Sequence, residues 1–485
     1  MSITSTIQIR LPRRVTLNPK CDWGVLVLAC VFLASSLMCW SVVCVGPKLT
    51  LAVAIVPLVL PFIVAYAAMT ERGILDPTAL FPAFFGAYNG FPLIRFLSDD
   101  VRNNLAYPVK FEPGIYFRAG LLSALGAIFI AITWALWRPP AHKKLPKHDV
   151  TGWFNTGVIC YAIGILLYFL QYQRIGGYWA ALAMDRVKRF ELMTQTTSSA
   201  YYAFVMVGLV MMIASGRSGV RKAAIVVMTA LWCVIVMAQG DRRLALQAVM
   251  AVTSAATFLM AKSTRIKMTH LLLAITTYVA FSAFGQLREV IPFLVSDAVP
   301  HPRPLDFGGT NSLLENSKPE NNELAGPFLS VLYNAEHVRD YSLGASYADS
   351  IFAVLPRVLY PGSKPLSATA KLDNALHYGG NRFPVAGWGY SPIAEAFLNF
   401  GLPGVCLISS LWMGAFVILS RLRNYSWGLV AVAVLSSETV NANRIDFRTV
   451  YLESFSCILA VLVAVLLVRS LHPRIHKLIE SRRVQ

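Results

Sequence analysis

Charged side chains are scarce in this chain. Only 14% of its 485 residues are Asp, Glu, Lys or Arg, whereas 56% are apolar. Because soluble domains usually carry about a quarter charged residues, this composition disfavours a water-soluble enzyme and indicates a protein solvated by lipid. It also excludes collagen-like, coiled-coil and disordered chains.

Cysteine pairs and several common catalytic motifs are lacking as well. The eight cysteines include no CxxC pair, and none lies in the one long hydrophilic segment, so we expect neither a disulfide framework nor a zinc site. The sequence contains no GxxxxGKS/T phosphate loop, no HExxH and no GxSxG. ATP-driven transport, zinc proteolysis and cytosolic sugar-nucleotide catalysis are therefore unsupported, and we expect no cofactor and no metal.

Long apolar runs fill most of the chain. A membrane-spanning helix needs about 20 predominantly apolar residues. Twelve such runs occur, at 24–46, 49–69, 75–97, 116–137, 153–172, 199–215, 222–239, 244–261, 269–285, 397–420, 425–440 and 451–469. The expected fold class is an all-α polytopic membrane protein with about 12 transmembrane helices.

The basic residues predict the orientation of these helices. With the N-terminus in the cytoplasm, the loops and termini on that side hold 22 Lys and Arg against five Asp and Glu, or +17 of the net charge of +18. This pattern holds only when 75–97, which prolines interrupt, crosses the membrane. We therefore expect both termini in the cytoplasm. Because topology explains the positive charge, we expect no nucleic-acid partner.

The apolar runs divide the chain into three parts. Residues 1–285 form an N-terminal bundle of about nine spans, 286–396 form a large periplasmic loop, and 397–485 form a C-terminal bundle of about three spans with a basic tail. Within outer segments, 178–192 and 347–355 have the pattern of short amphipathic helices. Since loops of this length are usually functional or disordered, we expect any active site there.

Two groups of arginines lie at the outer ends of predicted spans. Arg242 and Arg243 begin the eighth span, where the helix dipole and unpaired N–H groups already favour an anion. Arg444 and Arg448 precede the last span, with Asp446 between them. A phosphate or pyrophosphate would satisfy these arginines, which bind such groups bidentately. The alternatives are lipid phosphates for the first pair and an ion pair with Asp446 for the second.

The end of the large loop carries the candidate bases. Glu395 enters the tenth span beside apolar neighbours, where a carboxylate is costly unless it is paired or works as a base. His377 accepts a proton near neutral pH, although an ordinary loop histidine is simply solvated. The rings of Trp388 and Tyr390 suit stacking on a sugar, and equally suit anchoring at the membrane interface.

Two stretches of this region resemble a known family. The first runs Leu343-Gly-Ala-Ser-Tyr347 and continues through Pro356-Arg357 to Lys364-Pro365, and the second runs Ser391-Pro-Ile-Ala-Glu395-Ala-Phe-Leu-Asn399-Phe-Gly401. With the Gly240 to Arg243 stretch, they resemble the Wzy-type oligosaccharide repeat-unit polymerases, which make O-antigen and other bacterial surface polysaccharides.

The resemblance implies a GT-C-like glycosyltransferase of the bacterial inner membrane that acts at the periplasmic face. Its donor and acceptor would be oligosaccharides linked to undecaprenyl pyrophosphate, and its partners membrane lipids, a chain-length regulator and a flippase of the same pathway. The expected substrate-binding residues are Arg242, Arg243, Arg357, Arg382, Arg444, Arg448, Trp388 and Tyr390, and the expected bases are Glu395 and His377. The alternatives are an O-antigen ligase, which transfers polymer to lipid A-core, and a lipid-linked oligosaccharide flippase or secondary transporter.

Overall fold

The computed structural model of this chain is all-helical wherever it is described. It describes residues 23–43, 47–90, 113–138, 152–173, 175–184, 200–215, 219–259, 332, 342–354 and 391–471. Within these ranges 89% of the residues are helical and no strand occurs. The predicted all-α class is therefore confirmed for the described part of the chain.

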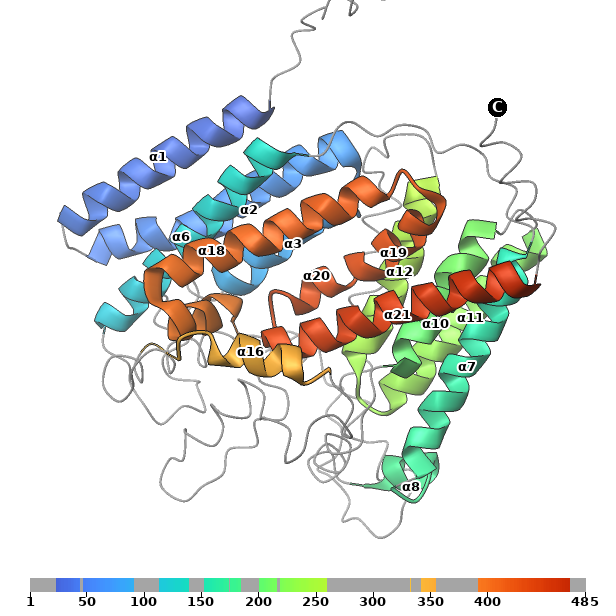
Figure 1. Ribbon diagram of the computed structural model, residues 1–485. Helices are drawn as coiled ribbons and strands as arrows, with labels where there is room; N and C mark the ends of the chain where they lie inside the picture. The colour runs from blue at the N-terminus through green and yellow to red at the C-terminus, as the bar shows by residue number, and fades with distance from the viewer. Residues whose placement is uncertain are drawn as a thin grey trace, which may run out of the picture.

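Most of the described helices coincide with apolar runs of the sequence. Figure 1 shows how these helices are arranged. In chain order they are α1 (Trp23–Val43), α2 (Pro47–Arg72), α3 (Pro77–Phe85) with the π-helical turn η1 (Gly86–Gly90), α6 (Pro113–Trp137), α7 (Trp153–Gln173), α8 (Tyr178–Ala183), α10 (Ala200–Ser215), α11 (Gly219–Ala238), α12 (Arg242–Leu259), α16 (Ala345–Phe352), α18 (Pro392–Leu422), α19 (Ser426–Ser436), α20 (Glu438–Asn441) and α21 (Phe447–Leu471). The predicted run 269–285 and most of the large loop lie outside the described residues.

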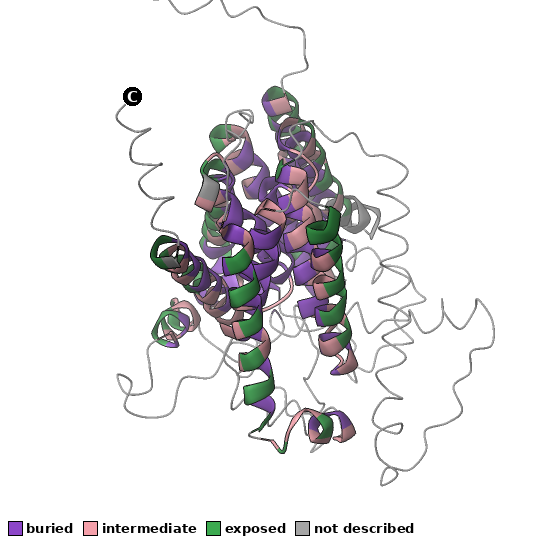
Figure 2. Ribbon diagram, turned by 90° about the vertical axis from the view of Figure 1, so that its right-hand side faces the viewer, coloured by how far each residue is buried: buried purple, intermediate pink, exposed green. Residues whose placement is uncertain are grey.

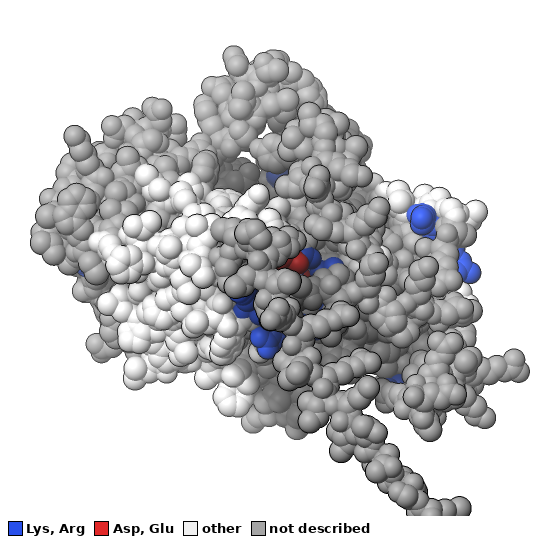
Figure 3. Space-filling view, turned by 90° about the horizontal axis from the view of Figure 1, so that it is seen from above, with Lys and Arg blue, Asp and Glu red and all other residues white. Residues whose placement is uncertain are grey.

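Six of these helices are long and apolar enough to cross a membrane, namely α2, α6, α7, α11, α18 and α21. Figure 2 shows that their buried faces point inward and their exposed faces outward, and many exposed side chains are large and apolar. From above, the described surface is largely uncharged, and its charged side chains gather in small groups (Figure 3). Such a surface is solvated by lipid rather than water, so the chain is a helical membrane protein.

The helices bury two apolar cores. The first bundle packs α1, α2, α3, α6 and α18 around side chains such as Trp134 and Phe81. The second bundle packs α7, α10, α11, α12, α19 and α21 around side chains such as Trp232. In this bundle Gly157 of α7 lies against Gly208 of α10, where a Cβ on Gly208 would lie 2.6 Å from the Gly157 carbonyl oxygen. Small residues of this kind let two helices in a membrane approach closely.

The segment predicted as the third span, 75–97, lies lengthwise beside α18 over its described residues. Ser420 Oγ donates to Asp76 at 2.9 Å and Ser391 Oγ donates to Asn89 at 2.8 Å. At the rise of an α-helix, the stretch from Asp76 to Asn89 is about 20 Å long. A straight helix from Ser391 to Ser420 would be about 44 Å long, which is too long to meet both of its ends. Both ends still meet, because α18 is broken at Gly401, whose φ of 65° is not helical.

Candidate functional site

Glu395 joins three helices at the start of α18. That helix begins at a strong signal, because the Ser391 side chain caps it by accepting from the Ile393 N–H at 3.2 Å. Glu395 is only 1% exposed. Its Oε1 accepts from Ser346 Oγ of α16 at 2.7 Å, and its Oε2 accepts from the Phe447 N–H of α21 at 2.8 Å. Each oxygen of this buried carboxylate thus accepts a hydrogen bond, which offsets part of the cost of burying it.

Asn399, one turn after Glu395, holds the same serine. Its Nδ2 donates to Ser346 Oγ at 2.8 Å and to the Glu395 carbonyl at 2.8 Å, and its Oδ1 accepts from the Ser346 N–H at 3.4 Å. Both the backbone and the hydroxyl of Ser346 are therefore fixed, although Ser346 itself is partly exposed. We call Glu395, Ser346 and Asn399 the Glu395 cluster.

Aromatic rings and a glycine close this cluster on one side. Tyr347 stacks on Phe400 with ring centroids 6.0 Å apart and meets Phe447 edge to face at 5.0 Å. Gly344 precedes α16 with a φ of 83°, and a Cβ there would lie 2.7 Å from Phe400 Cζ. Only glycine adopts this positive φ easily and also leaves room for the Phe400 ring. The predicted amphipathic helix at 347–355 corresponds to α16, which begins two residues earlier.

A second polar cluster surrounds Glu453 of α21. Arg243 Nη1 of α12 pairs with Glu453 Oε1 at 2.8 Å. The Nδ2 of Asn441 donates to Glu453 Oε2 at 2.7 Å and to Glu438 Oε2 at 2.8 Å. Gln247 Nε2 of α12 donates to Glu438 Oε1 at 3.0 Å. These five residues form the Glu453 cluster, which ties α12 to α20 and α21.

Burial within the Glu453 cluster is uneven. Glu438, Asn441 and Gln247 are at most 1% exposed and the Glu453 side chain is 6% exposed, whereas the Arg243 side chain is 29% exposed. The inner side of Arg243 therefore faces the carboxylates, whereas part of its surface is open.

The start of α12, where the sequence predicts an anion beside Arg243, has negatively charged partners within the protein. Asp241 caps the helix by accepting from the Leu244 N–H at 3.2 Å. Glu453 supplies a negative partner for Arg243 from within the protein. Arg243, a cation at the positive end of a helix, thus already has a negative partner. A phosphate there would be an additional partner rather than a required one. Arg242 makes interactions of its own beside it.

The arginines before α21 flank a helix cap. Asp446 is 2% exposed, and its Oδ1 accepts from the N–H and the hydroxyl of Thr449 at 2.9 and 2.8 Å, which caps α21. Arg444 and Arg448 are partly exposed on either side of it. The other predicted site residues, namely His377, Arg357, Arg382, Trp388 and Tyr390, lie outside the described residues and stay predictions.

A third network, the Arg423 cluster, lies where α2 and α18 end. Arg72 Nη2 donates to the Ser420 carbonyl at 2.7 Å, and Arg423 Nη1 donates to the Arg72 carbonyl at 2.8 Å. Asp76 Oδ2 accepts from Ser420 Oγ at 2.9 Å and lies 3.5 Å from Arg423 Nη1. The Arg423 guanidinium also lies 4.2 Å from the ring centroid of Phe258 on α12, so this cluster links the two bundles.

Sequence reasoning missed two of these features. From the sequence alone, Arg72, Asp76 and Arg423 fall among the cytoplasmic loop charges that predict the topology, yet the members of the Arg423 cluster are at most 4% exposed. Glu438 and Glu453 lie inside apolar runs and were not singled out. The signal was present, because an ionisable residue within a membrane-spanning run is costly and therefore usually has a buried partner or a function.

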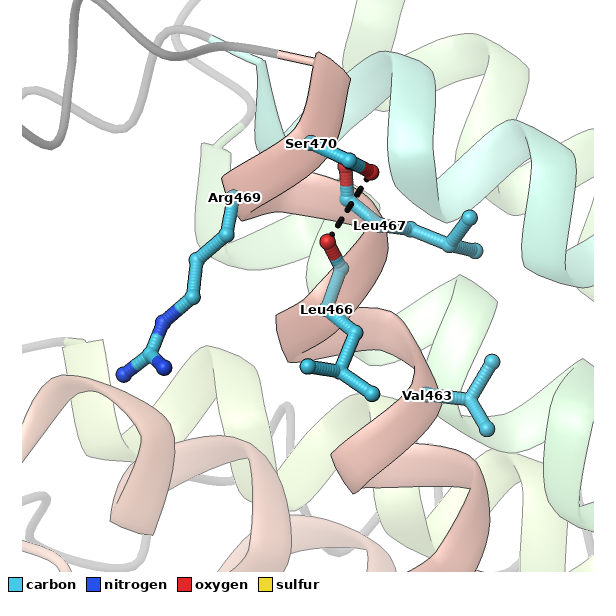
Figure 4. A pocket seen from close by; sticks show the side chains of 5 residues that line it. All are labelled: Val463, Leu466, Leu467, Arg469 and Ser470. Carbon is cyan, nitrogen blue, oxygen red and sulfur yellow. Dashed lines mark hydrogen bonds between the residues drawn. The ribbon is translucent and has the colours of Figure 1, made fainter.

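Among the described residues, a shallow groove at the end of α21 is lined by Val463, Leu466, Leu467, Arg469 and Ser470 (Figure 4). Its apolar walls with one arginine suit a lipid chain rather than carbohydrate chemistry. The described part of the chain holds no group of three His, Cys, Asp or Glu side chains that could bind a metal.

Comparison of the chain with protein-family models, with curated proteins and with solved structures gives no match. The resemblance to Wzy-type polymerases therefore depends on the sequence stretches alone.

Proposed function

We propose that this protein is a glycosyltransferase of the bacterial inner membrane that polymerises oligosaccharide repeat units at the periplasmic face. Its donor and acceptor are repeat units linked to undecaprenyl pyrophosphate, and its product is O-antigen or another surface polysaccharide. The reaction uses the energy of the lipid pyrophosphate bond, so it needs no nucleotide site.

One observation carries this proposal. The two stretches that resemble the polymerase family are 49 residues apart at Ser346 and Glu395, yet these two side chains share a 2.7 Å hydrogen bond. Asn399 and Phe400 of the second stretch contact Ser346 and Tyr347 of the first. Residues from the two stretches that resemble the family thus form one polar cluster, as expected of stretches that contribute to a common site.

The cluster supplies a route for the acceptor's proton. Ser346 is partly exposed and donates to the buried Glu395. As the acceptor hydroxyl oxygen bonds to the donor's anomeric carbon, its proton passes to Ser346 Oγ while the serine proton passes to Glu395. The bond from the anomeric carbon to the pyrophosphate oxygen breaks, and undecaprenyl pyrophosphate leaves with the electron pair. His377 is the second candidate base.

Arg243 is the described residue best suited to stabilise that leaving group. An arginine beside the pyrophosphate offsets the negative charge that grows as the anomeric bond breaks. Helix α21 connects it to the proton route, because Phe447 contacts Glu395 and Glu453, six residues later, contacts Arg243. Along a helix this separation is about 9 Å. Arg242, Arg357, Arg382, Arg444 and Arg448 remain candidate partners of the phosphates.

The proposed topology has about 12 spans, with both termini in the cytoplasm. The Glu395 and Glu453 clusters lie at the starts of α18, α12 and α21, whereas the Arg423 cluster lies at the end of α18. In the charge-derived orientation the first two clusters lie toward the periplasm and the third toward the cytoplasm. This agrees with lipid-linked substrates that reach the enzyme on the outer side.

The decisive test is polymer formation by purified protein with synthetic lipid-pyrophosphate-linked repeat units. We expect longer glycans without ATP and without metal. Ser346→Ala and Glu395→Gln should each lower the rate by about 100-fold, which is typical of losing a general base. Ser350→Ala is the matched control, because Ser350 Oγ of the same helix donates to the Ser346 carbonyl and not to Glu395.

The alternatives give different results. A transporter would leave the glycans at their original length. A ligase would not extend a lipid-linked acceptor and would require lipid A-core as the acceptor. Cells that lack a ligase would carry no repeat units on the core, whereas cells that lack a polymerase keep single repeat units on it. Unchanged product lengths for both Ser346→Ala and Glu395→Gln would remove the proton route from the proposal.

A further inference from the structure

We infer that Glu453 is a positioning residue that holds Arg243 in the orientation that binds the pyrophosphate of the lipid-linked donor. The inference rests on the proposed function, in which Arg243 contacts that group. It assigns a role to a carboxylate that lies in the last predicted span and that takes no part in the proton route.

The two partners differ in their access to solvent. The Glu453 side chain is 6% exposed and the Arg243 side chain 29%, and they are joined at 2.8 Å. The carboxylate therefore lies behind the guanidinium, which is the group that a ligand meets first. An arginine has five N–H donors in a rigid plane, so holding one edge fixes where the other edge points.

Glu453 is itself held from behind. Its second oxygen accepts from Asn441, whose same amide nitrogen donates to Glu438. The chain just after Asn441 is anchored to the first bundle, since Asn443 Nδ2 donates to the Phe81 carbonyl of α3 at 3.1 Å. This chain of contacts gives Glu453 a fixed place, as a group that orients another must have.

A competing interpretation predicts the opposite result. If Glu453 merely neutralised Arg243, it would compete with the pyrophosphate, and removing its charge would tighten binding. If Glu453 positions Arg243, moving the carboxylate without changing its charge weakens binding, because a displacement of about 1 Å is enough to spoil an aligned contact. Glu453→Asp makes this change, since aspartate is one methylene shorter.

The experiment measures binding of undecaprenyl pyrophosphate to purified full-length protein in detergent, with the melting temperature of each variant as the check on folding. We expect Arg243→Ala and Glu453→Asp each to weaken binding by about tenfold or more. The double variant should bind no more weakly than Arg243→Ala, because Glu453 acts through the arginine. Glu453→Gln, which keeps the length and removes the charge, should also weaken binding.

Each outcome decides between the interpretations. If Arg243→Ala weakens binding while Glu453→Asp and Glu453→Gln bind as tightly as the unaltered protein or more tightly, the positioning role is overturned and the proposed function stands. If Arg243→Ala binds normally, the pyrophosphate contact fails and the positioning role fails with it. Glu71→Asp is the control, because Glu71 pairs with Arg138 at a partly exposed site at the end of α2 and should leave binding unchanged.

Discussion

Replacing Asp76 by Asn removes the negative charge of the Arg423 cluster while preserving side-chain size. The asparagine oxygen can still accept from the Thr78 N–H, as the Asp76 side chain does when it caps α3. The charge pairing changes instead. Arg72 and Arg423, at most 4% exposed, both lie within 3.6 Å of the Asp76 carboxylate. Asp76→Asn takes that carboxylate away from two buried cations.

The expected cost follows from this burial. Breaking a buried ion pair by removing one partner costs about 3–5 kcal/mol, because the remaining charge stays away from water. Arg423 also lies over the ring of Phe258, so that it keeps one favourable contact after the substitution. We therefore expect Asp76→Asn to lower the free energy of unfolding by about 3 kcal/mol.

Denaturant unfolding of the detergent-solubilised protein, followed by tryptophan fluorescence, measures this loss. Glu71→Gln is the matched control from the same end of α2, where the partners Arg138 and Glu71 are 35% and 26% exposed and 3.4 Å apart. An exposed pair contributes about 0–1 kcal/mol. Equal losses for the two variants would refute the reasoning, since they would show that burial of the Arg423 cluster adds nothing to its importance.

Two glycine substitutions test close contacts elsewhere. Gly208→Leu should destabilise the protein by about 1–3 kcal/mol or more, because the new Cβ meets the Gly157 carbonyl oxygen and α7 must move away from α10. Gly219→Ala should not destabilise the protein, because the space around Gly219 is open. Gly344→Ala forces a φ of 83° on a side chain that meets Phe400, at a cost of about 1–2 kcal/mol, and should lower polymerisation by displacing α16. Normal polymerisation by Gly344→Ala would argue against a role for that contact.

Glu395 shows how much of the site was accessible to sequence reasoning. Its position among apolar residues at the entry to the tenth predicted span indicated a carboxylate that is costly unless it is paired or works as a base, and the structure shows it buried and hydrogen-bonded. Its partners were not predictable in the same way. Ser346 is 49 residues away, and the contact exists only because α16 packs against α18 and α21.

The arginines show the limit of reading charge from local context. The sequence placed Arg243 in the first turn of a helix and indicated that an anion belongs there. The structure provides an internal carboxylate, Glu453, from a helix that begins 204 residues later. Likewise, the sequence indicates that Arg72 and Arg423 are loop charges, because each borders an apolar run. Only the packing of the helices shows that the two side chains are buried together.

The sequence by itself determined that this is a helical membrane protein and roughly where its helices lie, because hydropathy and helix caps act over a few neighbouring residues. It also marked the start of α18 and the start of α12 as places where charge needs a partner. The tertiary structure decided which partners those charges have. Contacts between residues far apart in the chain depend on how whole helices cross, and no local pattern encodes that choice.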